Sequence, residues 1–228
     1  MLLITGDRKS QDGEESLKYR YVWTALLCVV LLMGCSRQVS TTKYYLLEYR
    51  PIANNKKLML EKPIDKRVQV VNFKIIRSYD SSHIIARFSS HQINFYRYSL
   101  WAVRPQIAIA DLLVQHINAY QLFKDCQREY LDENPDFEIS GEIQQVEKYE
   151  SQEYTAAHLK MRFDLYDYNS KDRLVTYAFD REIPIPTGDM TIFAKVLSDI
   201  SQDEAEKFLV NVVEWFKKQE ADSTQVPG

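Results

Sequence analysis

The side chains that could carry chemistry in this 228-residue chain are few and widely separated. The chain has four histidines, His83, His91, His116 and His158. No two of them have the sequence spacing that is typical of metal ligands. A nucleophilic pair is conceivable only for His116 and Cys126, which lie ten residues apart. A core histidine beside a buried thiol is the more ordinary interpretation of these two residues. The sequence therefore predicts neither a metal nor a cofactor.

Glycines and carboxylates argue further against an enzyme. Only Gly141 and Gly188 lie in the part expected to fold, whereas a phosphate-binding loop needs clustered glycines and a nucleophile elbow needs one on each side of its serine. Glu138, Glu142 and Asp164 alternate with apolar residues, which places them on a solvated sheet face. A glycosidase-type carboxylate pair stays open as an alternative, but we predict that the protein is not an enzyme.

The beginning of the chain has the pattern of an export signal. An apolar run of twelve residues, 22–33, is shorter than the roughly 20 residues of a membrane span, and Lys18 and Arg20 precede it. Residues 32–35, Leu-Met-Gly-Cys, resemble a bacterial lipobox. This resemblance implies that residues 1–34 are a lipoprotein signal peptide and that Cys35 carries three acyl chains. The alternative is a buried helix with Cys35 in the core.

Removing the signal leaves 194 residues, enough for one domain with its own core. The remaining 25 basic and 28 acidic residues give a net charge of −3, which argues against a nucleic-acid partner and gives no sign of docking to anionic lipid. Cys126 is then the one thiol left, so no internal disulfide can form and packing alone must hold the fold.

The spacing of apolar residues along the chain predicts the strands and helices that would position these side chains. Residues 35–43 are a polar tether that reaches at most about 27 Å, and residues 219–228 are expected to form a disordered tail. The predicted strands begin at residues 44, 67, 83, 92, 137, 161 and 175, and the predicted helices span 105–120 and 189–218. A capping-box pattern at Ser201–Glu204 allows a break in the second helix.

This order predicts an α+β fold for residues 44–218. We expect a single domain with a mostly antiparallel sheet of six to seven strands and two main helices packed on one face.

An aromatic run, "NFYRYSLW", occupies residues 94–101. Alternation along a strand puts Tyr96 and Tyr98 on one face and Phe95 and Arg97 on the other, with Trp101 in the second set if the strand is unbroken. Trp101 stands just before the predicted helix, which favours a place in the core. The remaining aromatics could serve either the core or a protein interface.

Three stretches together carry a family resemblance: "KYYLLEY" at 43–49, "YDSSHIIAR" at 79–87 and "YSLWAVRP" at 98–105. They resemble the auxiliary lipoproteins of ABC-type transport systems, including the paraquat-inducible lipoprotein group, over residues 44 to about 216. That family tends to carry an acidic residue after the Trp-Ala pair, where this chain has Val103 and Arg104. The resemblance assigns no catalytic residue, and it marks Tyr96, Tyr98 and Trp101 as family-motif positions that could contact a partner.

The resemblance implies a membrane-anchored periplasmic scaffold in a transport system for lipids or other hydrophobic substrates. Its expected partners are a substrate-binding protein of the mammalian-cell-entry type and the permease–ATPase complex. Lipidated Cys35 is expected to attach the protein to the membrane. Ser36 after the cysteine predicts the periplasmic face of the outer membrane. A homo-oligomer is compatible with this role. The alternatives are a periplasmic carrier of a hydrophobic ligand and a lipid-anchored hydrolase.

Overall fold

The computed structural model describes residues 23–24, 40–152, 154–186 and 188–224. The chain divides into two compact units, Met1–Thr41 and Thr42–Gly228, and the fold described below is that of the second. Cys35 and nearly all of the predicted signal peptide lie outside the described residues. In the part that is described, no helix combines the length and the apolar character needed to cross a bilayer.

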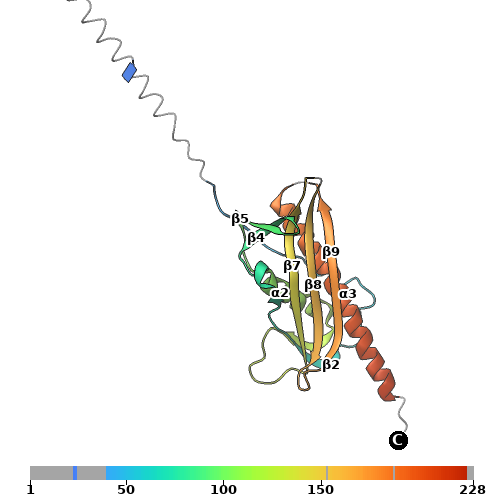
Figure 1. The fold of residues 1–228 in the computed structure, drawn as a ribbon. Helices are drawn as coiled ribbons and strands as arrows, with labels where there is room; N and C mark the ends of the chain where they lie inside the picture. The colour runs from blue at the N-terminus through green and yellow to red at the C-terminus, as the bar shows by residue number, and fades with distance from the viewer. Residues whose placement is uncertain (1–22, 25–39, 153, 187, 225–228) are drawn as a thin grey trace, which may run out of the picture. The chain divides into compact units, whose positions relative to one another are not determined.

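The described residues of the second unit form nine strands, one short 3₁₀ helix and two long helices, whose arrangement Figure 1 shows. In chain order these are β1 (Lys43–Tyr45), β2 (Ile64–Val70), β3 (Lys74–Ile75), η1 (Arg77–Tyr79), β4 (His83–Ser89), β5 (Gln92–Trp101), α2 (Pro105–Tyr120), β6 (Phe123–Gln127), β7 (Phe137–Glu150), β8 (Thr155–Asp167), β9 (Arg173–Ile185) and α3 (Met190–Thr224).

The long strand β7 organises the sheet. One of its edges pairs antiparallel with β8, which pairs antiparallel with β9. Its other edge pairs in turn with β2, β3 and β4, all of them parallel to it. Beyond these, β2 pairs with β6 in parallel, β4 forms an antiparallel hairpin with β5, and β5 pairs in parallel with β1.

The prediction of an α+β domain with two main helices is confirmed, but the predicted sheet was too simple. It has nine strands and is mixed, with five parallel and three antiparallel pairings. Alternation is typical of antiparallel strands, and β7, β8 and β9, which show it over many residues, do pair antiparallel. The parallel pairings all involve the short strands β1, β2, β3 and β6 or the edge of the β4–β5 hairpin. β6 was missed because its sequence, "FKDCQ", is short and charged.

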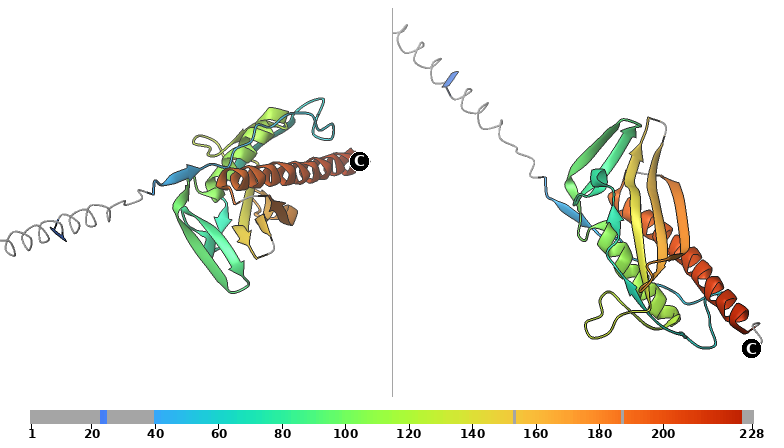
Figure 2. Two further views of the ribbon diagram at one scale, coloured as in Figure 1. Left: turned by 90° about the horizontal axis from the view of Figure 1, so that it is seen from above. Right: turned by 60° about the horizontal axis from the view of Figure 1, so that its bottom comes forward.

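Both helices pack against the same face of the sheet (Figure 2). From β8, Phe163 stacks on Phe208 of α3 with their ring centroids 5.1 Å apart. The helix α2 has the predicted bounds, with Pro105 in its first turn and a buried stripe that includes Ile109, Leu113 and Ile117. Among the described residues, the buried apolar core runs from Leu47 to Phe216, so this unit has a core of its own.

The helix α3 continues through the position where a break was considered. The Ser201 hydroxyl donates to the carbonyl of Leu197 at 2.8 Å, within the helix, and so does not cap a new one. The Glu204 carboxylate accepts from Tyr177, Arg181 and Lys207, so a tertiary cluster occupies it. The helix also runs to Thr224, which corrects the prediction of a tail beginning at residue 219. Residues 225–228 lie outside the described part of the chain.

The predicted first strand is shorter than expected. Only Lys43–Tyr45 pairs with the sheet, whereas Leu47 and Tyr49 are buried beyond the end of β1. The ring of Tyr49 lies edge-on to that of His116 in α2, with the centroids 5.6 Å apart. The amide of Glu48 donates to Ser198 in α3 at 3.1 Å. The apolar pattern of this segment therefore reflects packing against the helices.

Candidate functional site

The β4–β5 hairpin carries the residues of the family resemblance, and a buried carboxylate joins it to β7. Glu147 in β7 is fully buried and accepts hydrogen bonds from the Tyr79 hydroxyl and from Arg87 Nε, the latter at 2.6 Å. Its Oε1 also lies 3.2 Å from His158 Nδ1, while His158 Nε2 lies 2.8 Å from Asp180. We call these five residues the Glu147 cluster. It connects η1, β4, β7, β8 and β9.

The electrostatics of this cluster favour its charged form. Burial alone would raise the pKa of Glu147, but hydrogen bonds from His158, Arg87 and Tyr79 outweigh burial and hold that pKa below its ordinary value. Burial likewise works to lower the pKa of His158, yet its hydrogen bonds to Glu147 and Asp180 raise that pKa overall. Ion pairing therefore compensates the desolvation of both groups.

A second cluster holds the opposite face of the hairpin. Lys148 is 2% exposed, and its ammonium donates to Glu150 at 2.6 Å, to the Tyr96 hydroxyl at 3.2 Å and to the carbonyl of Gly188 at 3.0 Å. The Tyr96 hydroxyl donates to Glu150 as well, and burial followed by the nearby Glu150 carboxylate raises the pKa of Tyr96. Because Glu147 and Lys148 are neighbours on one strand, their side chains point to opposite faces of the sheet. The hairpin is thus fixed from both sides.

The three predicted family-motif residues have three different environments. Trp101 is 5% exposed and packs near Phe193 of α3, with ring centroids 6.0 Å apart, so it belongs to the core as its position before α2 predicts. Tyr96 is partly buried, and its hydroxyl accepts from Lys148 in the second cluster. Tyr98 is 41% exposed. Of the three, Tyr98 is the one available to a partner, and that contact stays a prediction.

The predicted alternation along β5 ends at Phe95. Ile85 of β4 pairs with Phe95 of β5, and His83 of β4 pairs with Leu100 of β5. Two residues of β4 therefore lie opposite five residues of β5. The strand is therefore irregular between these points, and His83 Nδ1 lies 3.0 Å from the carbonyl oxygen of Tyr96. The assignment of Trp101 to the face of Phe95 and Arg97 required an unbroken strand, and this condition is not met.

The hairpin exposes several aromatic side chains. The exposed fractions are 40% for Phe88, 53% for Phe95 and 41% for Tyr98. No Asp or Glu occurs from Ser81 to Ala110, although the chain as a whole is acidic. Arg97 is exposed and forms no ion pair with any described residue. The outer surface of the hairpin is thus aromatic and free of carboxylates.

The conceivable Cys–His pair is not assembled for nucleophilic chemistry. Burial, followed by the neighbouring Asp125, raises the pKa of the Cys126 thiol to about 12, which keeps it protonated at neutral pH. His116 is fully buried against Tyr49 and Tyr120, and burial lowers its pKa. Both residues have the core roles that the sequence favoured.

The predicted placement of the strand carboxylates is partly wrong. The side chains of Glu138 and Glu142 are 26% and 34% exposed, respectively, but that of Asp164 is only 3% exposed. Asp164 accepts from Arg162 Nε at 2.8 Å and from the Thr176 hydroxyl, so basic and hydroxyl neighbours cover it. Among the residues that the structure describes, no group of three His, Cys, Asp or Glu side chains could hold a metal ion.

Glu147, Lys148 and His158 are the residues that sequence reasoning did not single out for the hairpin. The stretch "YDSSHIIAR" did contain a signal, because its first and last residues, Tyr79 and Arg87, both contact Glu147. Glu147 and Lys148 themselves are adjacent charged residues on a strand and give no local indication of burial.

No protein-family model matches the sequence, and neither does any curated protein. Solved structures do resemble this fold. One is a protein from Xanthomonas campestris described as family DUF330, with a TM-score of 0.67 and 14% identity, covering 78% of this chain and 99% of that one. Another is an uncharacterized protein with a TM-score of 0.56 and 14% identity, covering 73% and 95% of the two chains. At these identities the likeness concerns the fold alone.

Proposed function

We propose that this protein is a lipid-anchored periplasmic accessory component of an ABC-type transport system of the mammalian-cell-entry type. In this role it acts as a protein–protein scaffold beside a machine that moves lipids or other hydrophobic substrates. Lipidated Cys35 attaches it to the periplasmic face of the outer membrane, and the domain that follows contacts the substrate-binding protein or the permease–ATPase complex.

The observation that supports this proposal most directly is the convergence of residues from the aromatic run and from two of the stretches that carry the family resemblance. Tyr79 and Arg87 meet on Glu147, Tyr96 joins Lys148, and Trp101 enters the core beside α3. Residues at separate places in the sequence thus build one rigid hairpin. A rigid hairpin with exposed aromatic side chains suits a protein interface, because large aromatic residues are enriched there.

Affinity capture from solubilised cell envelopes tests the proposal. We expect the wild-type chain to co-purify with a mammalian-cell-entry type protein, its permease and its ATPase. Tyr98→Ala should reduce their recovery about tenfold or more, because truncating a central interface aromatic costs about 2 kcal/mol or more. Its melting temperature should stay that of the wild type, since Tyr98 is 41% exposed.

Two variants make this experiment specific. Leu131→Ala removes a side chain that is 88% exposed in the β6–β7 loop and should capture like the wild type. Trp101→Ala should lose about 3–5 kcal/mol of stability, as large core truncations do, and should lose capture only through unfolding. A wild-type chain that recovers none of the transport components would contradict the proposed function.

A further inference from the structure

The direction of β1 shows from which side the chain enters the domain. Lys43, Tyr44 and Tyr45 pair in parallel with Ser99, Leu100 and Trp101 of β5. Moving back along the chain from Lys43 therefore leads toward Tyr98 and the beginning of β5. That beginning is the β4–β5 turn, residues 89–92. The chain therefore enters β1 from the side of this turn.

Two lengths decide how near the turn comes to the membrane. From Leu100 back to Gln92, β5 is irregular, and its partner β4 covers the same stretch in only six residue steps, from His83 to Ser89, about 20 Å at 3.3 Å per residue. The tether from Cys35 to Lys43 reaches at most about 27 Å when fully extended. A tether that runs along the strand would therefore end about 7 Å beyond the turn. Any slack brings the turn to the level of the lipidated residue.

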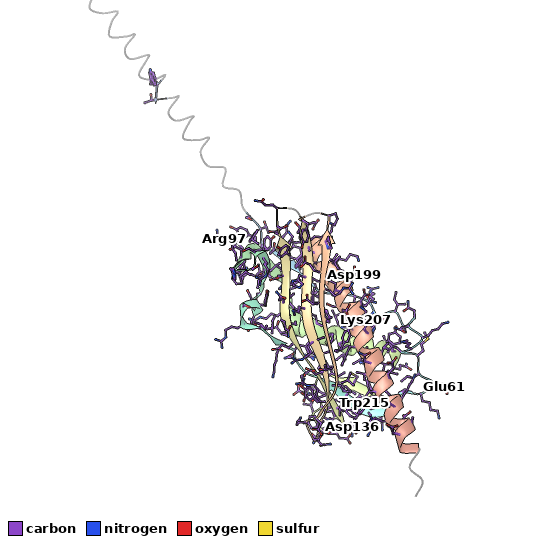
Figure 3. The ribbon with its side chains drawn as sticks, turned by 45° about the vertical axis from the view of Figure 1, so that its right-hand side comes forward. Glu61, Arg97, Asp136, Asp199, Lys207 and Trp215 are labelled. Carbon is purple, nitrogen blue, oxygen red and sulfur yellow. The ribbon has the colours of Figure 1, made fainter. Side chains whose placement is uncertain are left out.

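The opposite end of the domain is far from this position. β4 pairs with Lys148 and Tyr149 at the end of β7, whereas β7 begins at Phe137. Figure 3 shows Arg97 near the hairpin end and Asp136 and Trp215 toward the other end of the unit. Leu131 and Asp136 lie in the same loop, which connects β6 to β7. The two ends thus provide a test position and a matched control.

The side chains at the hairpin end suit a phospholipid headgroup layer. Phe88 and Phe95 are exposed, and aromatic residues are enriched at the membrane–water interface. The hairpin carries no carboxylate whose burial among headgroups would cost energy, and exposed Arg97 can pair with a lipid phosphate. Because the two ion clusters fix the hairpin to β7, these side chains are held in place before any contact forms.

We propose that the β4–β5 turn rests on the surface of the phospholipid bilayer that holds Cys35, with Phe88 inserted among the lipids. This inference rests on the anchoring in the proposed function. An anchor holds the hairpin at high effective concentration beside the bilayer, so a weak contact suffices to orient the domain. The contact would leave the far end of the sheet turned away from the membrane and the flank of the hairpin that carries Tyr98 free for a protein partner.

The test replaces the natural anchor, so that it does not depend on lipidation of Cys35. Residues 36–228 with an amino-terminal histidine tag are bound to phospholipid vesicles that contain nickel-chelating lipid, which preserves the length of the tether. This part contains the whole buried core. Phe88→Trp and Leu131→Trp each add one exposed fluorophore, and the parent chain measures the signal of Trp101 and Trp215. The vesicles carry lipids brominated in their acyl chains, which quench a tryptophan that enters the bilayer.

We expect bromolipids to quench the added fluorescence of Phe88→Trp at least twofold more than that of Leu131→Trp. Equal quenching of the two would overturn the membrane contact. The membrane contact would also be overturned if bromolipid did not quench Phe88→Trp but solubilised transport components shifted its emission. That result would assign the hairpin to a protein partner. Failure of Cys35 lipidation in cells would instead overturn the anchor while leaving this vesicle result intact.

Discussion

At the scale of single residues, the central feature is a carboxylate that is fully buried and fully partnered. The Glu147 carboxylate accepts hydrogen bonds from the Tyr79 hydroxyl and the Arg87 guanidinium, and it lies beside the His158 ring. A buried charge is tolerable only with such partners, and removing one member leaves the others desolvated and unpaired. The cluster thus makes the position of the hairpin depend on one side chain.

We therefore expect Glu147→Gln to lower the free energy of unfolding by about 3–5 kcal/mol, the usual cost of breaking a buried ion pair. Glu138→Gln is the matched control on the same strand. Its side chain is 26% exposed and lies 3.8 Å from exposed Lys171, so its loss should cost less than about 1 kcal/mol. Urea denaturation of both variants measures the difference, and equal midpoints would show that the Glu147 cluster contributes little.

The pH dependence of stability should report His158. Its pKa is raised in the folded state, so its contribution is complete below its unfolded pKa, near 6.5, and is lost as pH rises through the higher folded pKa. His158→Gln should therefore cost about 1.5–3 kcal/mol at pH 5.5, the range for hydrogen bonds to charged groups, and clearly less at pH 9. Glu147, with its lowered pKa, contributes above its unfolded value near 4.5 and loses this contribution in stronger acid.

Thermal melts of the wild type and His158→Gln across this range measure the effect. His91→Gln in the exposed hairpin turn is the control and should follow the wild type at every pH. A constant gap between the wild type and His158→Gln from pH 5.5 to 9 would show that His158 is held by packing and that its charge is irrelevant.

At the scale of elements, local patterns predicted some features well for identifiable reasons. The helix α2 was predicted with its observed bounds because Pro105 marks its beginning and a clear apolar stripe follows. The β4–β5 hairpin and the three long strands were also predicted, since each has alternation over many residues. The parallel pairings along β7 could not be predicted, because they join segments up to about 70 residues apart and leave no local trace.

The candidate site was predicted less completely than the fold. The burial of Glu147 comes from Arg87 and Tyr79, which lie 60 and 68 residues away in the sequence. On a strand, such a residue has the same alternation whether the surface above it is open or covered. The place of Trp101 in the core was predictable, because the start of a helix at Pro105 fixes its surroundings.

The long helix α3 offers a prediction at this scale. Its second half, after Asp203, supplies five large buried side chains: Phe208, Leu209, Val212, Val213 and Phe216. Each contributes about 1.5–3 kcal/mol on burial, which together matches or exceeds the typical net stability of about 5–15 kcal/mol. A chain ending at Asp203 should therefore not fold. A chain ending at Lys218 keeps all five and should melt cooperatively, as circular dichroism would show. A cooperative transition in the shorter chain would make the second half an appendage.

At the scale of the whole molecule, the anchor and the domain impose a common geometry. If Cys35 carries three acyl groups, as proposed, the chain would stay in its bilayer, because stable anchoring needs two or more. The tether would then confine the domain to within about 27 Å of the surface. In the arrangement proposed above, the hairpin end would face that surface and the beginning of β7 would face away from it. A scaffold of this kind would offer partners its sides, including the flank of the hairpin that carries Tyr98.

The last prediction concerns the anchor itself. The wild-type chain should remain with membranes after an alkaline wash, whereas Cys35→Ala should be unprocessed or soluble and should leave the membrane fraction. Ser36 should direct the wild type to outer-membrane fractions on a density gradient, and Ser36→Asp should shift it to inner-membrane fractions, with Ser36→Ala as the matched control that stays. Equal retention of the wild type and Cys35→Ala would contradict lipidation at this cysteine. Inner-membrane sedimentation of the wild type would contradict the sorting but not the anchor, because the acyl chains bind either bilayer.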